Sequence, residues 1–112
     1  MLDPIAARLE HYLDLLATRQ KLVTTNIANA DTPGYRTRDL DFQQEFASLV
    51  PGAPPNVINP EGLMVKNDGN DVSLDRESRL LAENAMRFNL AASLLKGQLH
   101  QVRKAIEEGK NG

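Results

Sequence analysis

Two asparagines three residues apart are the side chains of this sequence best placed for specific polar chemistry. Asn26 and Asn29 lie in the stretch NIANADTPGY, which follows about twenty residues of helical pattern. A primary amide both donates and accepts hydrogen bonds, so the pair offers recognition of polar groups. A buried Asn in a helix seam fixes register and partner at a cost in stability. An Asn at a helix end bonds the last carbonyls or takes the left-handed cap, and both interpretations stay open.

The four residues that end this stretch predict a tight turn directly after the asparagines. Pro33 suits the first central position of a type II turn, and Gly34 suits the second, which requires a positive φ. Thr32 and Tyr35 would then flank the turn. Such a turn redirects the chain sharply and presents Tyr35 at its exit.

The other polar residues show no spacing that supports catalysis or metal binding. His11 and His100 are the only histidines, neither lies in a ligand-spaced cluster, and there is no cysteine. No nucleophile elbow or phosphate-binding loop occurs. The acidic run from Asp68 to Asp71 fails the register of a calcium loop and favours a turn with a helix cap. We therefore expect no catalytic residue, no cofactor and no metal site.

Composition indicates one small domain and excludes several classes of partner. The chain has 112 residues, 41% of them hydrophobic but only 4% aromatic, and a net charge of -2. Both signs of charge are spread along the chain, which argues against binding to nucleic acid and to anionic membranes. The N-terminal apolar residues are spaced rather than continuous, which is not the pattern of a secretory signal. Every apolar run is far shorter than the roughly 20 residues of a membrane span.

A long helix is predicted to position the asparagines. Asp3 and Pro4 form a typical helix start, and Pro33 ends the helix. We assign residues 1–31 to this helix, of which about 27 helical residues would span about 40 Å. From Leu9 the seam positions alternate at spacings of four and three, with Gln20 in the one polar slot, which is a heptad seam. The seam consists of Leu9, Leu13, Leu16, Val23 and Ile27.

The middle of the chain, residues 32–70, is expected to be irregular. A short amphipathic helix is predicted to begin near Asp41. Residues 51–62 carry four of the six prolines and favour an extended linker or a disordered loop. Residues 63–65 are predicted to form a brief strand, followed by a turn-rich stretch.

A second long helix is predicted over residues 71–108. Apolar residues recur every seven positions, and their companions are expected four residues further on. About 34 helical residues would span about 50 Å, with Gly97 as the one weak point, costing about 1 kcal/mol relative to Ala. The predicted seam consists of Leu74, Leu81, Phe88, Leu95, Leu99, Val102 and Ile106.

The expected fold class is mainly α, with two long terminal helices packing as a coiled coil around an irregular, proline-rich middle segment. One helix pair has little interior, and a core of this size contributes only a few kcal/mol. The chain is therefore expected to complete its core with neighbours. These could be copies in a polymer or, alternatively, the partner in a discrete dimer of a helical adaptor.

The motif resembles the N-terminal signature of the flagellar rod, hook and hook-filament axial proteins. This resemblance rests on Asn26, Ala28, Asn29, Thr32, Pro33, Gly34 and Tyr35. The continuation RTRDLDF, the short length, and the stretches GNDVSLDRE and LAEN are similar to a short proximal-rod member of that family. The similarity covers both ends of the chain and is missing in the proline-rich middle.

The resemblance implies a non-enzymatic subunit of the flagellar basal body. Such proteins are exported unfolded through the flagellar type III apparatus, without a cleaved signal peptide, and assemble in the periplasm. The implied partners are the chain itself, other rod proteins, the export apparatus, and the membrane ring or its adaptor at the rod base. Asn26 and Asn29 would then hydrogen-bond backbone groups at the helix end and across a subunit contact.

Overall fold

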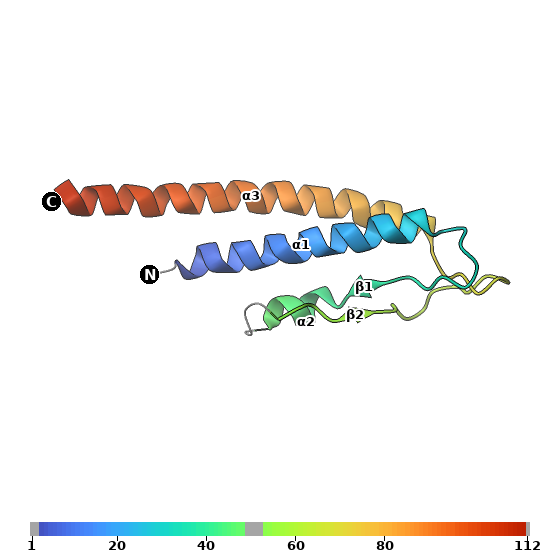
Figure 1. Cartoon of the computed structure of the whole chain (residues 1–112). Coiled ribbons are helices and arrows are strands. Elements are labelled where there is room, and N and C mark those ends of the chain that lie inside the picture. Colours follow the sequence, from blue (N-terminus) through green and yellow to red (C-terminus); the bar gives the residue numbers. More distant parts are fainter. Residues whose placement is uncertain (1–2, 49–52, 112) are drawn as a thin grey trace.

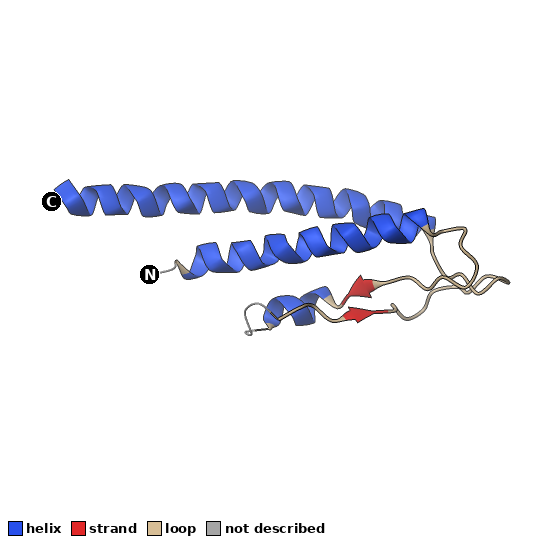
Figure 2. Ribbon diagram, in the orientation of Figure 1, coloured by secondary structure: helices blue, strands red, loops and turns tan. Residues whose placement is uncertain are grey.

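In the computed structural model, which describes residues 3–48 and 53–111, two long helices lie side by side and antiparallel (Figure 1). Helix α1 spans Pro4–Ala28 and helix α3 spans Leu74–Asn111. A small third layer lies on the opposite side of α1 and contains helix α2 (Phe42–Ala47), strand β1 (Asp39–Leu40) and strand β2 (Val57–Ile58). The molecule measures 70 × 26 × 18 Å. The predicted fold class is confirmed, since helix dominates the structure (Figure 2).

Helix α1 begins as the sequence predicts and ends slightly early. Asp3 Oδ1 accepts a hydrogen bond from the backbone N–H of Ile5 at 3.2 Å, and Pro4 occupies the first turn. At the other end, the Asn29 N–H donates to the carbonyls of both Thr25 and Asn26. Bonds to the third preceding residue tighten the last turn of a helix, so the α-helix ends at Ala28.

The core is a thin layer between α1 and α3. Leu16 and Val23 of the predicted α1 seam are each only 1% exposed, whereas Leu9, Leu13 and Ile27 are half-buried. The apolar residues buried in the structure are Ala6, Leu15, Leu16, Val23, Ala30, Leu40, Val72 and Ala91.

The row of α3 that packs deepest on α1 differs from the predicted row of companions. The buried positions are Glu77, Asn84 and Ala91. Each of them comes three residues after a member of the predicted seven-residue repeat (Leu74, Leu81, Phe88), whereas the companions are expected four residues after it. Among the predicted seam residues of α3, Leu81, Leu95 and Val102 are half-buried. The remaining ones are exposed by between 40% and 57%: Leu74, Phe88, Leu99 and Ile106.

The two helices are offset along their common axis. The side chain of Gln98 donates to Asp3 Oδ2 at 2.7 Å, so the start of α1 lies beside Gln98. The last turns of α3 run on beyond this point for about 20 Å (Figure 1). Leu99, Val102 and Ile106 lie on this projecting part, with no described segment of the chain alongside it.

Helix α2 docks on α1 through aromatic side chains. The predicted short helix is confirmed, and Asp41 caps it by accepting from the Gln44 N–H at 3.3 Å. Tyr12 meets the rings of Phe42 and Phe46 edge-on, at centroid distances of 5.4 and 5.3 Å. These contacts attach the small layer to α1, and such aromatic pairs contribute about 0.5–1.5 kcal/mol each beyond their buried area.

The strand predicted at residues 63–65 is wrong, because the strands form elsewhere. Antiparallel pairing joins Asp39 to Ile58 and Leu40 to Val57. Residues 63–65 lie between Gly62, which has a φ of +79°, and a turn, and have no partner strand in the part of the chain described. For residues 53–62 the disordered alternative is also wrong, because Asn56 N–H donates to Glu45 Oε1 at 2.9 Å. Pro51 and Gly52 lie outside the described residues.

Candidate functional site, a polar junction at the turn end of the helices

Asn26 lies at the centre of a buried polar cluster that joins both long helices to the segment between them. Its side chain is fully buried although it comes from the last turn of α1. The amide nitrogen donates to the Arg38 carbonyl at 2.9 Å and to Glu77 Oε1 at 2.8 Å. The amide oxygen accepts from the Tyr35 hydroxyl at 2.9 Å and from the Arg38 N–H at 3.1 Å. The hydrogen-bonding capacity of this amide is therefore used within the chain.

A series of charged side chains extends the cluster across all three layers. Arg76 donates to Glu77 Oε1 at 3.0 Å and to Asp39 Oδ2 at 2.6 Å. Arg19 reaches Asp39 from α1 through two bonds of 3.0 Å, the fork geometry that favours arginine over lysine. The two acids balance the two bases. We call this cluster the polar junction, and it consists of Arg19, Asn26, Tyr35, Asp39, Arg76 and Glu77.

The pKa values of the two carboxyls of the polar junction are shifted in opposite directions. Burial raises the pKa of Glu77 above its ordinary value, and Arg76 offsets only part of that effect. Burial also acts on Asp39, but hydrogen bonds from Arg19 and Arg76 outweigh it and lower the pKa of that carboxyl. The difference arises because Asp39 is held by two guanidinium groups and Glu77 by one.

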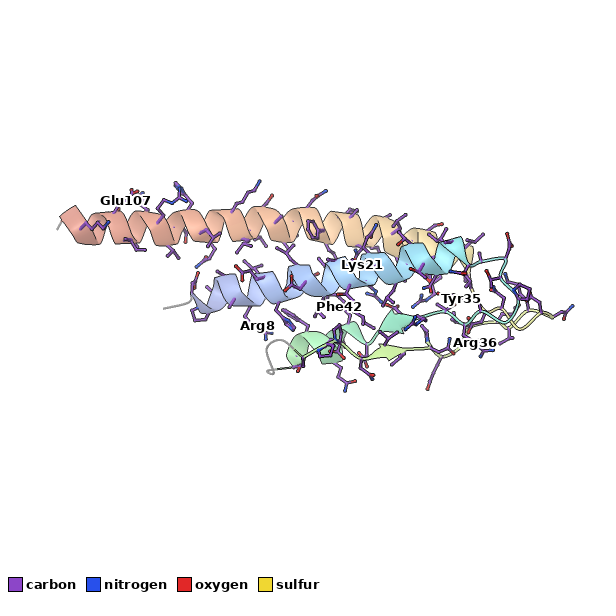
Figure 3. The ribbon with its side chains drawn as sticks, in the orientation of Figure 1. Arg8, Lys21, Tyr35, Arg36, Phe42 and Glu107 are labelled. Atoms are coloured by element: carbon purple, nitrogen blue, oxygen red, sulfur yellow. The ribbon has the colours of Figure 1, made fainter. Side chains whose placement is uncertain are left out.

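The predicted type II turn is confirmed and brings Tyr35 to the junction. The Tyr35 N–H donates to the Thr32 carbonyl at 3.2 Å, and Gly34 has a φ of +76°. A Cβ added at Gly69 would lie 3.4 Å from Gly34 Cα, so two glycine backbones pass close to each other here. Burial raises the pKa of the Tyr35 hydroxyl, which favours the neutral form that donates to Asn26. Tyr35 and Arg36 lie together at the turn end of the helices (Figure 3).

Asn29, in contrast to Asn26, acts at the helix end. Its amide nitrogen donates to the Thr25 carbonyl at 2.9 Å, and its side-chain oxygen accepts from the Thr32 hydroxyl at 3.0 Å. Its φ is -108°, so the left-handed cap considered for it is wrong and the bond to a last carbonyl is observed. Ala28 and Pro33 are exposed beside it.

Asn70 fastens the end of α1 to the segment that leads into α3. Its fully buried side chain donates to the Asn29 carbonyl at 2.9 Å and to the Thr32 carbonyl at 2.8 Å. Its oxygen accepts from the Val72 N–H at 2.8 Å. One side chain therefore joins two carbonyls just beyond the end of α1 to the segment that leads into α3.

Asp71 ties the same segment to the chain after the turn. Its carboxylate accepts from the Thr37 N–H and, at 2.9 Å, from the Asn59 side chain. Arg36 approaches it at 3.3 Å. Burial alone would raise the pKa of Asp71, but the hydrogen bonds from Asn59 and Thr37 lower it below its ordinary value.

Sequence reasoning missed most of the polar junction, although a signal was present. One row of α3 repeats every seven residues and consists of Glu77, Asn84, Ala91 and Gln98, of which only Ala91 is apolar. Polar residues at heptad spacing indicate a seam that mixes hydrogen bonds with apolar contact. Asp39 gives no comparable signal, because its partners Arg19 and Arg76 are distant in sequence.

The junction can act as a rigid joint, and nothing in it points to catalysis. Its side chains are paired with one another and enclosed by three segments. Within residues 3–48 and 53–111, no three His, Cys, Asp or Glu side chains group as metal ligands. No helix in the same ranges is long and apolar enough to cross a membrane.

A comparison with protein families matches this part of the chain. The model of a family described as flagella basal body rod protein matches residues 13–36. The matched segment runs from the middle of α1 through the type II turn and contains Arg19, Asn26 and Tyr35 of the polar junction.

Individual relatives match nearly the whole chain. Flagellar basal body rod protein FlgB of Escherichia coli (strain K12) is 30% identical over 137 positions, covering 97% of this chain and 99% of the relative. FlgB of Yersinia enterocolitica is 28% identical, covering 97% and 100%. FlgB of Cereibacter sphaeroides (strain ATCC 17029 / ATH 2.4.9) is 32% identical over 112 positions, covering 85% and 88%. The first two alignments exceed the 112 residues of this chain, so those relatives carry residues that it lacks.

Proposed function

This chain belongs to the family of flagellar basal body rod proteins, and on that premise we propose that it is a structural subunit of the proximal rod. It joins other rod proteins in the tubular drive shaft that flagellar motility requires, and it is not an enzyme. The similarity to FlgB proteins over nearly the full chain carries this proposal.

Exposed apolar residues on α3 support a role in assembly. Leu74, Leu99 and Ile106 are exposed by 53%, 47% and 57% although they continue the heptad seam. Residues that are exposed in the single chain but occupy seam positions are suited to contact a neighbouring helix. We propose that residues 1–31 and 71–108 form the packed helices of the rod and that residues 32–70 form its middle segment.

The family motif has two roles in this proposal. Asn26 and Tyr35 act inside the chain, where they hold the polar junction together. Ala28, Thr32 and Pro33 are exposed at the turn end, where they contact the next subunit, and Asn29 lies between the two groups. The motif thus fixes the shape of the turn and presents its surface.

The proposed partners and location follow from the rod assignment. The chain binds copies of itself and other flagellar rod proteins, and it meets the membrane ring or an adaptor protein at the rod base. It reaches the periplasm through the flagellar type III export apparatus without a cleaved signal peptide. The absence of cysteine supports export of an unfolded chain, because no disulfide has to be opened first.

Basal-body purification tests the proposed function. The chain, carrying a small epitope tag, is expressed in a flagellated host whose own proximal rod gene of this type is deleted. We expect the tag in purified basal bodies and restored swimming in soft agar. A chain that is produced, forms a discrete dimer in sedimentation and is missing from basal bodies would favour the helical adaptor instead.

A further inference from the structure

One flank of α3, beside its contact with α1, carries a second apolar row. Met86, Leu90 and Leu94 follow one another at four-residue spacing, and their exposed fractions are 72%, 63% and 54%. Residues at this spacing lie on one face of a helix. Ala91, which is buried against α1 at 2% exposure, lies about 100° around the helix from Leu90. We call these three residues the outer row.

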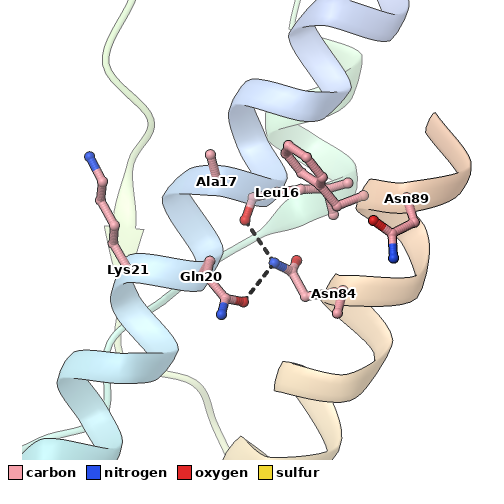
Figure 4. Close-up of a pocket in the computed structure, with 8 residues that line it drawn as sticks. Leu16, Ala17, Gln20, Lys21, Asn84 and Asn89 are labelled. Atoms are coloured by element: carbon pink, nitrogen blue, oxygen red, sulfur yellow. Dashed lines mark hydrogen bonds between the residues drawn. The ribbon is translucent and has the colours of Figure 1, made fainter. Parts of the chain in front are cut away.

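A groove of about 440 Å³ lies between α1 and α3 (Figure 4). Asn84 crosses its floor, where its amide nitrogen donates to the Leu16 carbonyl at 2.9 Å and to Gln20 Oε1 at 3.1 Å. Its walls are lined by Ala17 and Lys21 of α1 and by Ala85 and Phe88 of α3. We call this the interhelix groove. Phe88 is 40% exposed, so the groove offers apolar surface to a neighbour.

The outer row and the interhelix groove lie at the same height on the helix pair but on different sides of it. Phe88 of the groove stands in sequence between Met86 and Leu90 of the outer row, and two residues along a helix are about 200° apart around its axis. A second copy displaced sideways, without a shift along the helix axis, therefore brings its outer row to the groove of the first.

One pair of opposite charges lies at this height. Glu83 is exposed one turn before the outer row, with the exposed Arg79 and Arg87 four residues to either side of it, and Lys21 is exposed at the groove. The two residues share a height, because Asn84, next to Glu83, bonds Gln20, next to Lys21. In the sideways arrangement, Glu83 of one copy faces Lys21 of the other. The attraction between the two charges favours this height over others.

We propose that the outer row of one copy docks in the interhelix groove of a second copy of this chain. The inference rests on the proposed rod function and names the surfaces by which neighbouring copies meet. The two surfaces are different patches, so the contact is heterologous and leaves a free row and a free groove at the ends. Such contacts build rings or open helical assemblies rather than closed dimers.

Disulfide trapping tests this contact in assembled rods. The chain has no cysteine, so a variant with Met86→Cys and Ala17→Cys forms disulfides only at these two exposed positions. After oxidation of purified basal bodies, we expect a ladder of dimers, trimers and larger species from the double variant. Each single variant should remain monomeric, because neither surface meets itself.

A matched control keeps Ala17→Cys and replaces Met86→Cys by Gln101→Cys. Gln101 is exposed on the same helix but about 22 Å further along, so this pair should give no ladder. A dimer from Met86→Cys alone would overturn the proposal in favour of a symmetric contact. A double variant that is present in basal bodies but gives no ladder would overturn it as well, while leaving the proposed function intact. Absence of the chain from basal bodies would contradict both the docking proposal and the proposed function.

Charge reversal provides a second measurement. Glu83→Lys places two positive charges at the contact, so the yield of the disulfide ladder should fall several-fold. Adding Lys21→Glu to the same chain should restore the yield. Equal yields from all three chains would show that Glu83 and Lys21 do not face each other and would overturn the assigned height.

Discussion

Asn26 and Asn29 are the same residue type three positions apart, yet they differ in burial and in how far along the chain their hydrogen-bond partners lie. Asn26 is fully buried, and its side chain bonds Tyr35 and Arg38 in the segment after α1 and Glu77 on α3. Asn29 is half-buried, and its side chain bonds only residues within four positions of itself. Substitutions at the two sites should therefore separate folding of the chain from assembly of the rod.

Asn26→Leu should lower the free energy of unfolding by about 2–4 kcal/mol. Its loss leaves the Tyr35 hydroxyl without its acceptor and removes one of the donors to the buried Glu77 carboxylate, which keeps Arg76. A buried group that loses its hydrogen bond costs about 1–3 kcal/mol. Urea unfolding followed by circular dichroism measures the change. A loss below 0.5 kcal/mol would show that the junction relaxes around the substitution.

Asn29→Leu should cost only about 0.5–1 kcal/mol, the size of one lost local hydrogen bond. If Asn29 contributes to a subunit contact, cells carrying this variant should make and export the chain but fail to incorporate it into basal bodies. Swimming at the wild-type rate would leave Asn29 with a capping role alone. Asn26→Leu serves as the comparison in which stability and assembly are lost together.

Stability should depend on pH, because folding shifts the pKa values of three carboxyls and not all in the same direction. Asp39 and Asp71 have lowered pKa values, so their stabilising effect is present above the ordinary value of 3.8 and is lost as pH falls through their folded values. Glu77 has a raised pKa, so its favourable contribution is present below its ordinary 4.5 and is lost as pH rises through its folded value.

Glu77→Gln should remove the part of the pH dependence of stability that comes from Glu77. In wild type, the free energy of unfolding should decline as pH rises from 4.5, and in Glu77→Gln this decline should disappear. Acid unfolding at lower pH should persist in both chains, because Asp39 and Asp71 are unchanged. Urea unfolding at a series of pH values between 3 and 8 checks both halves, and an unaltered slope in the variant would contradict the assignment.

At the scale of elements, the two long helices carry two kinds of seam residue that substitutions can distinguish. On α1, Leu16 is 1% exposed, whereas Leu99 and Ile106 of α3 are exposed by 47% and 57%. Leu16→Ala should cost about 2–5 kcal/mol in the isolated chain. Leu99→Asp and Ile106→Asp should stay within about 0.5 kcal/mol of wild type there, yet prevent incorporation into basal bodies by placing a charge in a buried contact.

Arg79→Ala provides the matched control, because Arg79 is exposed on α3 outside both the predicted seam and the outer row. It should leave both stability and incorporation unchanged. Basal bodies that contain Leu99→Asp and Ile106→Asp at wild-type levels would remove these residues from the assembly surface.

The sequence predicted the elements better than their contacts. Asp3 with Pro4 marked the start of α1, and Asp41 marked α2, because capping is a local property of a few residues. The companion row of α3 lies three residues after the repeat and not the predicted four, because the polar residues Glu77 and Asn84 occupy two of its positions and an apolar pattern does not identify them. The pairing of Asp39 with Arg19 and Arg76 depends on three segments meeting in space, which no local pattern encodes.

The whole molecule is long and thin, with extents of 70 × 26 × 18 Å, so it has little interior. The apolar area left exposed on α3 can be buried only by another molecule, and association stabilises the associated fold by mass action. We expect the helical content of the purified chain to rise with its concentration. Circular dichroism between low micromolar and near-millimolar chain checks this, and a helical content independent of concentration would mean that the monomer is stable alone.

The offset between α1 and α3 has a mechanical consequence. Within the described residues α3 projects as a single helix past Asp3. A molecule that buries Leu99 and Ile106, which are exposed on this part of α3, must therefore lie alongside the projecting turns. The connection is then a lap joint, in which twisting is resisted as shear along the flanks of overlapping helices. Shear over several turns loads many weak contacts at once, whereas a butted end would concentrate the same torque on a few.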